Sequence, residues 1–126
     1  MRADLDPSLD ALTNKIIGCA FTVGHTLGHG FLELVYKNAL CLELESEGLS
    51  TSKEKSFYIF YREQRVGTYV ADIVVNDRII VELKVAEALS SAHSAQLLNY
   101  LKASRLPVGL LFNFGKPRID VKRVIL

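Results

Sequence analysis

The chain has 126 residues, 49% of them apolar, and a formal net charge of +1, which fits one ordered domain spanning residues 1–126. This charge provides no long-range field for nucleic acid, so any basic surface must be local. No apolar stretch is long enough to cross a bilayer, and the aspartates near the N-terminus argue against a signal peptide. Two cysteines, Cys19 and Cys41, fall in helical patterns, where we expect buried thiols in a cytoplasmic protein.

The chain begins with a predicted helix over residues 7–24. Asp6 is a typical cap, the proline after it suits the first helical position, and apolar residues recur at helical spacing. The glycine-rich segment 24–30 is predicted to be a loop. It could cradle a phosphate, although it matches no known phosphate-binding pattern and a plain connection is simpler. His25 and His29 could bind a metal or could be ordinary surface or capping groups.

A second helix is predicted over residues 31–47, ending at Gly48, a typical residue after a helix. Glu33 falls in its first turn, where the helix dipole stabilises a carboxylate. From its spacing alone, Glu33 could serve only to stabilise the start of the helix, or it could belong to a functional site. The apolar residues expected to face the core are Leu32, Val35, Ala39 and Leu42.

Three strands in a meander are expected next, because β-branched and aromatic residues alternate with polar breaks. The last two strands are apolar on both faces, so layers should cover both sides of the sheet. The expected segments are a polar connection at 50–55, strands at 57–61, 66–75 and 79–84, and turns at 62–65 and 76–78.

Three charged residues lie inside the last two of these strands: Asp72, Glu82 and Lys84. A buried charge is costly unless it is paired or binds a metal. Glu82 and Lys84 are two residues apart and share a face. Asp72 joins them only if the loop has three residues or a bulge, because a two-residue turn would put Glu82 on the opposite face. Two carboxylates and an ammonium on one face suit a divalent cation acting on a phosphate.

A third helix is predicted over residues 89–104, with Gln96 and Tyr100 one turn apart. This pair could simply cover the sheet, or it could position water, metal ligands or a phosphate. An apolar strand over 108–114 follows the helix, and its position allows parallel pairing. With a last strand over 119–125, the expected order is ααβββαββ.

The string Asp72 … Glu82-Leu83-Lys84 followed by Gln96-x-x-x-Tyr100 resembles the PD-(D/E)xK nuclease superfamily. Residues 30–36 spell Gly-x-x-Glu-x-x-Tyr, which is similar to the motif of the GxxExxY proteins, small bacterial and archaeal members of that superfamily. The resemblance covers about residues 16–124. It departs from the pattern at Ala71, where the name-giving proline would precede the aspartate.

The resemblance implies a mixed α/β fold with a restriction-endonuclease-like core, in which helices flank a mixed sheet. It implies metal-dependent hydrolysis of phosphodiester bonds, foremost in DNA, with Mg²⁺ or Mn²⁺ as cofactor. Lys84 would position or activate the attacking water, or offset phosphate charge. The implied metal ligands are Asp72, Glu82, the backbone carbonyl of Leu83 and Glu33, and the supporting residues are Gln96 and Tyr100.

The principal alternative is a non-catalytic nucleic-acid-binding or protein-assembly module on a nuclease fold, because a fold does not fix a function. A different phosphoryl-transfer or hydrolase reaction at the same site is a third hypothesis. Metal affinity at Asp72 and Glu82 would distinguish the nuclease from the non-catalytic module, because the module has no need to bind a metal there. The high apolar fraction also suggests a homodimer, which would pair two cutting sites for the two strands of a duplex.

Overall fold

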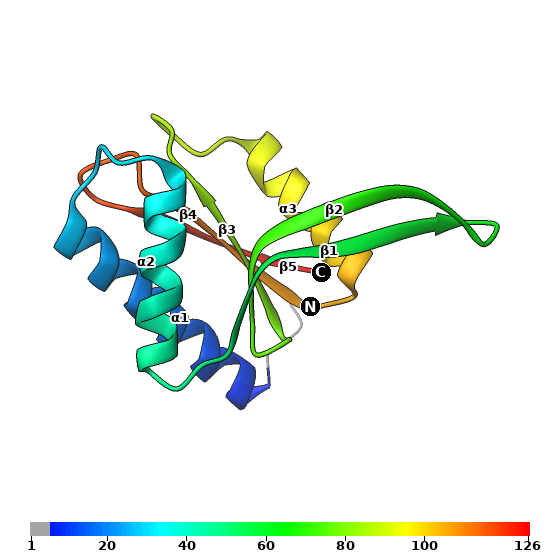
Figure 1. Cartoon of the computed structure of the whole chain (residues 1–126), viewed down its shortest axis with the longest axis horizontal. Helices are drawn as coiled ribbons and strands as arrows, with labels where there is room; N and C mark the ends of the chain where they lie inside the picture. The colour runs from blue at the N-terminus through cyan, green and yellow to red at the C-terminus, as the bar shows by residue number, and fades with distance from the viewer. Residues whose placement is uncertain (1–5) are drawn as a thin grey trace.

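The computed structural model describes residues 6–126, which contain three helices and five strands in the predicted order ααβββαββ (Figure 1). The elements are α1 (Pro7–Leu27), α2 (Glu33–Ser46), β1 (Thr51–Tyr61), β2 (Gln64–Val75), β3 (Ile79–Lys84), α3 (Ser91–Ser104), β4 (Val108–Asn113) and β5 (Asp120–Ile125). No helix in this range has the length and apolar character needed to span a membrane.

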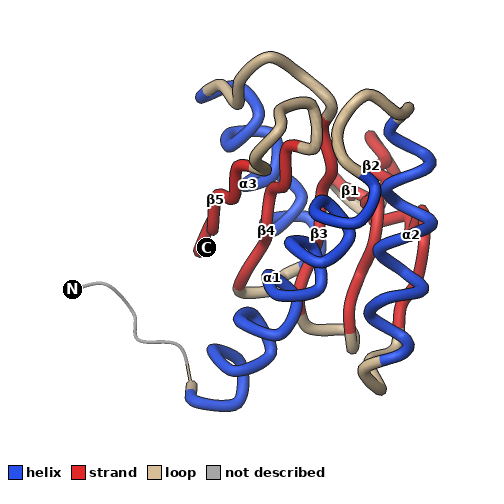
Figure 2. The backbone as a smooth tube through the Cα atoms, turned by 90° about the vertical axis from the view of Figure 1, so that its left-hand side faces the viewer, coloured by secondary structure: helices blue, strands red, loops and turns tan. Residues whose placement is uncertain are grey.

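The strands form one mixed sheet in the order β1-β2-β3-β4-β5. β3 and β4 are parallel, a pairing that the helical crossover allows, and the other pairs are antiparallel. α1 and α2 cover one face of the sheet and α3 covers the other (Figure 2). The predicted class, a mixed sheet flanked by helices, is therefore confirmed.

The core has one part on each face of the sheet. Val81 and Leu83 of β3 pack in the larger part, under α1 and α2, whereas Ile80 packs in the smaller part, under α3. Both faces of the central strands are thus buried, which explains their continuous apolar runs.

α1 is longer than predicted, because residues 24–27 are its last turn and not part of a loop. Gly24 lies inside the helix. A Cβ at this position would lie 2.8 Å from Cγ2 of Ile119, so the absence of a side chain lets α1 pack closely against Ile119. The helix ends at Gly28, which has a φ of 71° and donates its N–H to the Gly24 carbonyl. His25 therefore lies in a helix.

The predicted core face of α2 is wrong. Leu32 and Leu42 are 80% and 71% exposed, Val35 is also exposed and Ala39 is only partly buried. The helix carries two neighbouring apolar stripes, and spacing alone could not say which one faces the sheet. The stripe that does so consists of Tyr36, Leu40, Cys41 and Leu44.

β1 is also longer than predicted, because residues 51–55 belong to the strand and not to a connection. β1 is an edge strand, and these residues pair through their backbone with their side chains largely exposed, so they lack apolar alternation. The following turn consists of Arg62 and Glu63 alone, and residues 64 and 65 already belong to β2. The remaining boundaries differ from prediction by one or two residues.

Candidate active site

The β2–β3 hairpin sets the face on which the charged residues lie. Val75 pairs with Ile79, so residues 76–78 form the three-residue loop that the sequence predicts. The first two of them, an asparagine and an aspartate, have φ values of 52° and 53°, a conformation that these residue types tolerate. Continued one residue beyond the last backbone pair, Ile73 with Val81, the same register brings Asp72 opposite Glu82.

The two carboxylates hold the strands together where backbone pairing stops. The last backbone pair on this side is Ile73 with Val81. Beyond it, the Asp72 N–H donates to Oε2 of Glu82 at 2.7 Å. The Leu83 N–H donates to Oδ2 of Asp72 at 2.9 Å. Each carboxylate accepts a hydrogen bond from the backbone of the opposite strand, which fixes both side chains.

Glu82 is only 6% exposed. Burial first, and the charge of Asp72 second, raise the pKa of Glu82 to about 8, although the Asp72 N–H and Lys84 act in the opposite direction. Without a bound cation, Glu82 is therefore mostly protonated at neutral pH. A divalent cation would relieve the repulsion between the two carboxylates and displace this proton.

Two lysines face the carboxylates. Lys84 lies on the same face of β3 as Glu82, is half-buried, and lowers the pKa of Glu82. Lys37 of α2 places Nζ 3.2 Å from Oδ1 of Asp72, with both side chains largely buried. Burial lowers the pKa of Lys37, but the charge and hydrogen bond of Asp72, together with the charges of Glu54 and Glu33, raise it above its ordinary value. Sequence reasoning missed Lys37, although it lies four residues after Glu33 on the same helix face.

Glu33, the first residue of α2, lies near these charges. Burial and the charge of Asp72 raise the pKa of Glu33, whereas Lys84 and Lys37 lower it. The side chain is half-buried, so it remains accessible from solvent. Glu33 therefore belongs to the electrostatic environment of the carboxylate pair.

Tyr36 anchors the loop that precedes Glu33. Its hydroxyl donates to the Gly28 carbonyl at 2.7 Å and accepts from the Phe31 N–H at 3.2 Å. Its buried ring stacks on Phe114 with 4.7 Å between ring centres. The glutamate and the tyrosine of the motif thus have separate tasks, because one faces the site and the other fixes the chain beside it.

A metal fits the carboxylate pair better than it fits a larger cluster. Within residues 6–126, no three His, Cys, Asp or Glu side chains are grouped closely enough to hold a metal ion. Glu33 therefore does not complete a three-carboxylate group with Asp72 and Glu82, and His25 and His29 belong to no such group. Mg²⁺ commonly uses one or two carboxylates together with water and substrate phosphates, and Asp72 and Glu82 provide oxygen donors of this kind.

α3 brings Tyr100 beside the carboxylates. Tyr100 is buried, and its ring centre lies 5.0 Å from that of Tyr69. Burial, Glu82 and Asp72 raise the pKa of the Tyr100 hydroxyl. Gln96 is exposed on the same helix, and within the described residues no hydrogen bond joins its side chain to either carboxylate.

Asn113 fixes the chain that follows Lys84. Its buried side chain donates from Nδ2 to the Ala86 carbonyl at 3.0 Å. Its Oδ1 accepts the N–H groups of Ala86 at 3.0 Å and Gly115 at 2.9 Å. A Cβ on Gly115 would lie 2.5 Å from the backbone of Ala86, so the two segments touch directly. The charge pattern that indicated Lys84 contained no signal for Asn113.

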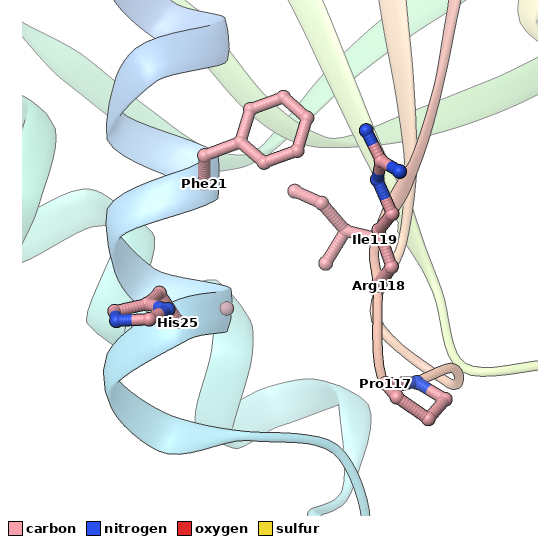
Figure 3. A pocket seen from close by; sticks show the side chains of 6 residues that line it. Phe21, His25, Pro117, Arg118 and Ile119 are labelled. Carbon is pink, nitrogen blue, oxygen red and sulfur yellow. The ribbon is translucent and has the colours of Figure 1, made fainter.

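A hollow of about 280 Å³ lies between α1 and the β4–β5 turn (Figure 3). It has no acidic lining residue and shares none with the carboxylate site, so we place the candidate active site at Asp72 and Glu82 instead. The residues that line the hollow are Phe21, Gly24, His25, Pro117, Arg118 and Ile119.

Comparison with known proteins identifies the family of the chain. No curated protein matches the chain. A solved structure described as the crystal structure of SSO0001 is 18% identical, with a TM-score of 0.58, and covers 72% of this chain. The match covers 48% of that structure, so the chain spans about half its length, and the likeness concerns the fold alone. A family model described as the PD-(D/E)XK nuclease superfamily matches residues 10–124, and this chain therefore belongs to that superfamily.

Proposed function

We propose that this protein is a nuclease that uses Mg²⁺ or Mn²⁺ to hydrolyse phosphodiester bonds in DNA. The observation that carries the proposal is the buried Glu82 beside Lys84: its carboxylate accepts the Asp72 N–H, and the Asp72 carboxylate accepts the Leu83 N–H. Burying two carboxylates together is unfavourable for the fold itself, so a cation-binding role explains their placement. Membership of a nuclease superfamily supports the reaction class.

In the proposed site, Asp72 and Glu82 hold the cation with the backbone carbonyl of Leu83, and Glu33 contributes through a water molecule. When bound, the cation would polarise the phosphate and lower the pKa of a water molecule. Lys84 shares the face of Glu82, where it orients the attacking water or offsets phosphate charge.

The residues of α3 have different proposed tasks at this site. Tyr100 packs beside the carboxylates and limits their hydration, consistent with its burial. Gln96 is exposed, so we assign it to contact with substrate and not to support of the ligands. The one-turn spacing of Gln96 and Tyr100 suggests a shared supporting role, whereas we propose a separate task for each residue.

We also propose that the chain is a GxxExxY protein. The support is that the three motif residues form one structural unit at the start of α2. Gly30 has a φ of 117°, which glycine accepts readily, Glu33 begins the helix beside Asp72, and Tyr36 anchors the loop.

A homodimer and a cytoplasmic location complete the proposal. Leu32, Val35 and Leu42 form an exposed stripe along α2 at a spacing suited to packing against a second helix. Sedimentation equilibrium should show a dimer that Leu42→Glu converts to a monomer, and a monomeric wild type would reject this part. The cytoplasmic location is supported by Cys19 and Cys41, which are buried and unpaired by disulfides.

A cleavage assay tests the proposed nuclease. The purified protein should cut circular or linear DNA when Mg²⁺ or Mn²⁺ is added, and Glu82→Ala should abolish cutting. The matched control is Glu87→Ala, which removes an exposed glutamate five residues later and should leave cutting unchanged. Circular substrates distinguish cutting within a strand from cutting at ends.

Calorimetry with Mn²⁺ separates the proposal from its alternative. If the protein is a nuclease, the wild type should bind Mn²⁺ and Glu82→Ala should not. No cutting under any condition, together with no bound Mn²⁺, would instead identify a binding or assembly module on the same fold. Cutting that survives in Glu82→Ala would remove the site assignment.

A further inference from the structure

The β1–β2 hairpin extends well beyond the rest of the sheet, forming an arm (Figure 1). Its outer half exposes aromatic side chains that no core contact requires. Tyr58, Phe60 and Tyr61 are all exposed, with 62% of Phe60 accessible. Large exposed aromatic groups concentrated on one projecting element mark a binding surface.

Cationic groups lie against these rings. The guanidinium carbon of Arg65 is 4.7 Å from the centre of the Tyr58 ring, and that of Arg62 is 5.3 Å from the Tyr61 ring. Arg65 also pairs directly with Phe60 across the hairpin, so these two side chains share a face. The arm thus places positively charged groups against exposed aromatic rings.

The C-terminal end of α3 adds two further cations. Lys102 and Arg105 line a hollow of about 370 Å³ together with Tyr58 and Phe60. We call Tyr58, Phe60, Arg65, Lys102 and Arg105 the arm platform. Over residues 55–71 and 91–105 the chain has five lysines and arginines and a single acid, Glu63, although the whole chain carries only +1. The platform is therefore a local basic surface in a nearly neutral protein.

Two arginines of this region lie at left-handed backbone positions. Arg62 and Arg105 have φ values of 50° and 63°. Arg62 lies in a two-residue hairpin turn and Arg105 ends α3, positions where asparagine or glycine is favoured. Glycine in place of Arg105 should therefore favour the local backbone.

The arm and the carboxylate site are joined by strand β2. β2 runs from Arg65 to Asp72, a distance of roughly 20 Å along one strand. Tyr69 lies between them and contacts Tyr100 with 5.0 Å between ring centres. A flexible chain that enters over the arm can thus follow β2 to the carboxylates.

We infer that the arm platform binds a single-stranded segment of nucleic acid and leads it to the carboxylate site. Bases stack on Tyr58 and Phe60, and phosphates contact Arg65, Lys102 and Arg105. Stacking on exposed rings requires unpaired bases, which favours a single strand over a duplex. A second copy of the chain fits poorly, because a symmetric contact would place like charges against one another. This inference rests on the proposed function, since it names the substrate of that same site.

Fluorescence anisotropy with an oligothymidylate of about 12 nucleotides tests the inference in EDTA, where no cutting occurs. Phe60→Ala should weaken binding about tenfold, and Phe60→Leu should weaken it as well because the ring is lost while the apolar surface remains. The controls are Phe21→Ala and Lys15→Ala, exposed residues of α1, and both should bind as the wild type does.

The double variant Lys102→Gln/Arg105→Gly removes two charges of the arm platform. Glutamine is a good helix former at the exposed end of α3, and glycine is favoured at the left-handed position of Arg105. The slope of log affinity against log salt should fall by about 1.4, the value for two contacts with single-stranded phosphates. An unchanged slope, or a preference for duplex over single strand, would overturn the inference.

The test also separates this inference from the proposed nuclease. If the wild type cuts DNA while Phe60→Ala binds the oligonucleotide normally, the platform is wrong and the nuclease stands. If Phe60→Ala loses binding while the wild type never cuts, the platform stands and the nuclease is wrong. A wild type that does not bind the oligonucleotide rejects the platform.

Discussion

Replacing Glu82 by glutamine should stabilise the metal-free protein at neutral pH. The pKa of Glu82 is raised from 4.5 to about 8, by burial first and by Asp72 second, so the folded protein binds this proton more tightly than the unfolded chain does. The resulting stabilisation is fully present below pH 4.5 and is lost as the pH rises towards 8. Glutamine carries no charge at any pH and retains an oxygen for the Asp72 N–H.

The size of the effect follows from the distance between pH 7 and the unfolded pKa of 4.5, about 2.5 pH units. At about 1.4 kcal/mol for each unit, the wild type loses about 3 kcal/mol of unfolding free energy between these two pH values. Glu82→Gln should lose none of it. In a domain of this size, about 3 kcal/mol corresponds to a change in Tm of roughly 10 °C.

Urea unfolding in EDTA measures this difference at several pH values between 4.5 and 8. The advantage of Glu82→Gln should be small at pH 4.5 and reach about 3 kcal/mol at pH 7. The control is Glu87→Gln, an exposed residue whose unfolding free energy should parallel that of the wild type. Parallel curves for the wild type and Glu82→Gln would refute the argument from burial.

Three further changes test other contacts. Lys37→Met removes the cation that lies 3.2 Å from Asp72, so Mn²⁺ binding measured by calorimetry should tighten about fivefold; unchanged or weaker binding would contradict this competition. Tyr36→Phe removes the hydroxyl that satisfies the loop backbone, so thermal unfolding should show a loss of about 1–3 kcal/mol, and an unchanged Tm would show that the anchor is dispensable. Gly115→Ala drives a Cβ against backbone 2.5 Å away and should cost about 2 kcal/mol in urea unfolding; Gly18→Ala, at a helical position where a Cβ meets nothing within 4 Å, should cost nothing, and the reverse order would argue against the clash.

The register of the β2–β3 hairpin was predictable because it follows from a chemical requirement. Asp72 and Glu82 can share a face only if the loop between their strands has an odd number of residues or contains a bulge. The structure has a three-residue loop. The element order was also predictable, because the long apolar runs and the crossover helix are local signals, and this helix allows the parallel pairing that the structure has.

Other features depend on contacts between distant segments, so local patterns could not indicate them. Lys37 belongs to the site only because α2 turns that face towards Asp72. Asn113 matters because parallel pairing brings the end of β4 beside the chain after β3. The first residues of β1 are polar because an edge strand is held by its backbone, which leaves no hydrophobic pattern to read.

The short loop of the β2–β3 hairpin has a consequence for the order of folding. Asp72 and Glu82 meet by closure of a three-residue loop, a fast local event, whereas β4 can pair only after α3 has crossed the sheet. In an isolated hairpin, both carboxylates would be hydrated and ionised at neutral pH. Glu82 is buried only in the packed fold, in which α3 brings Tyr100 beside the carboxylates. Its raised pKa is therefore a property of that packing, and proton uptake accompanies the packing of the helices on the sheet and not the closure of the hairpin.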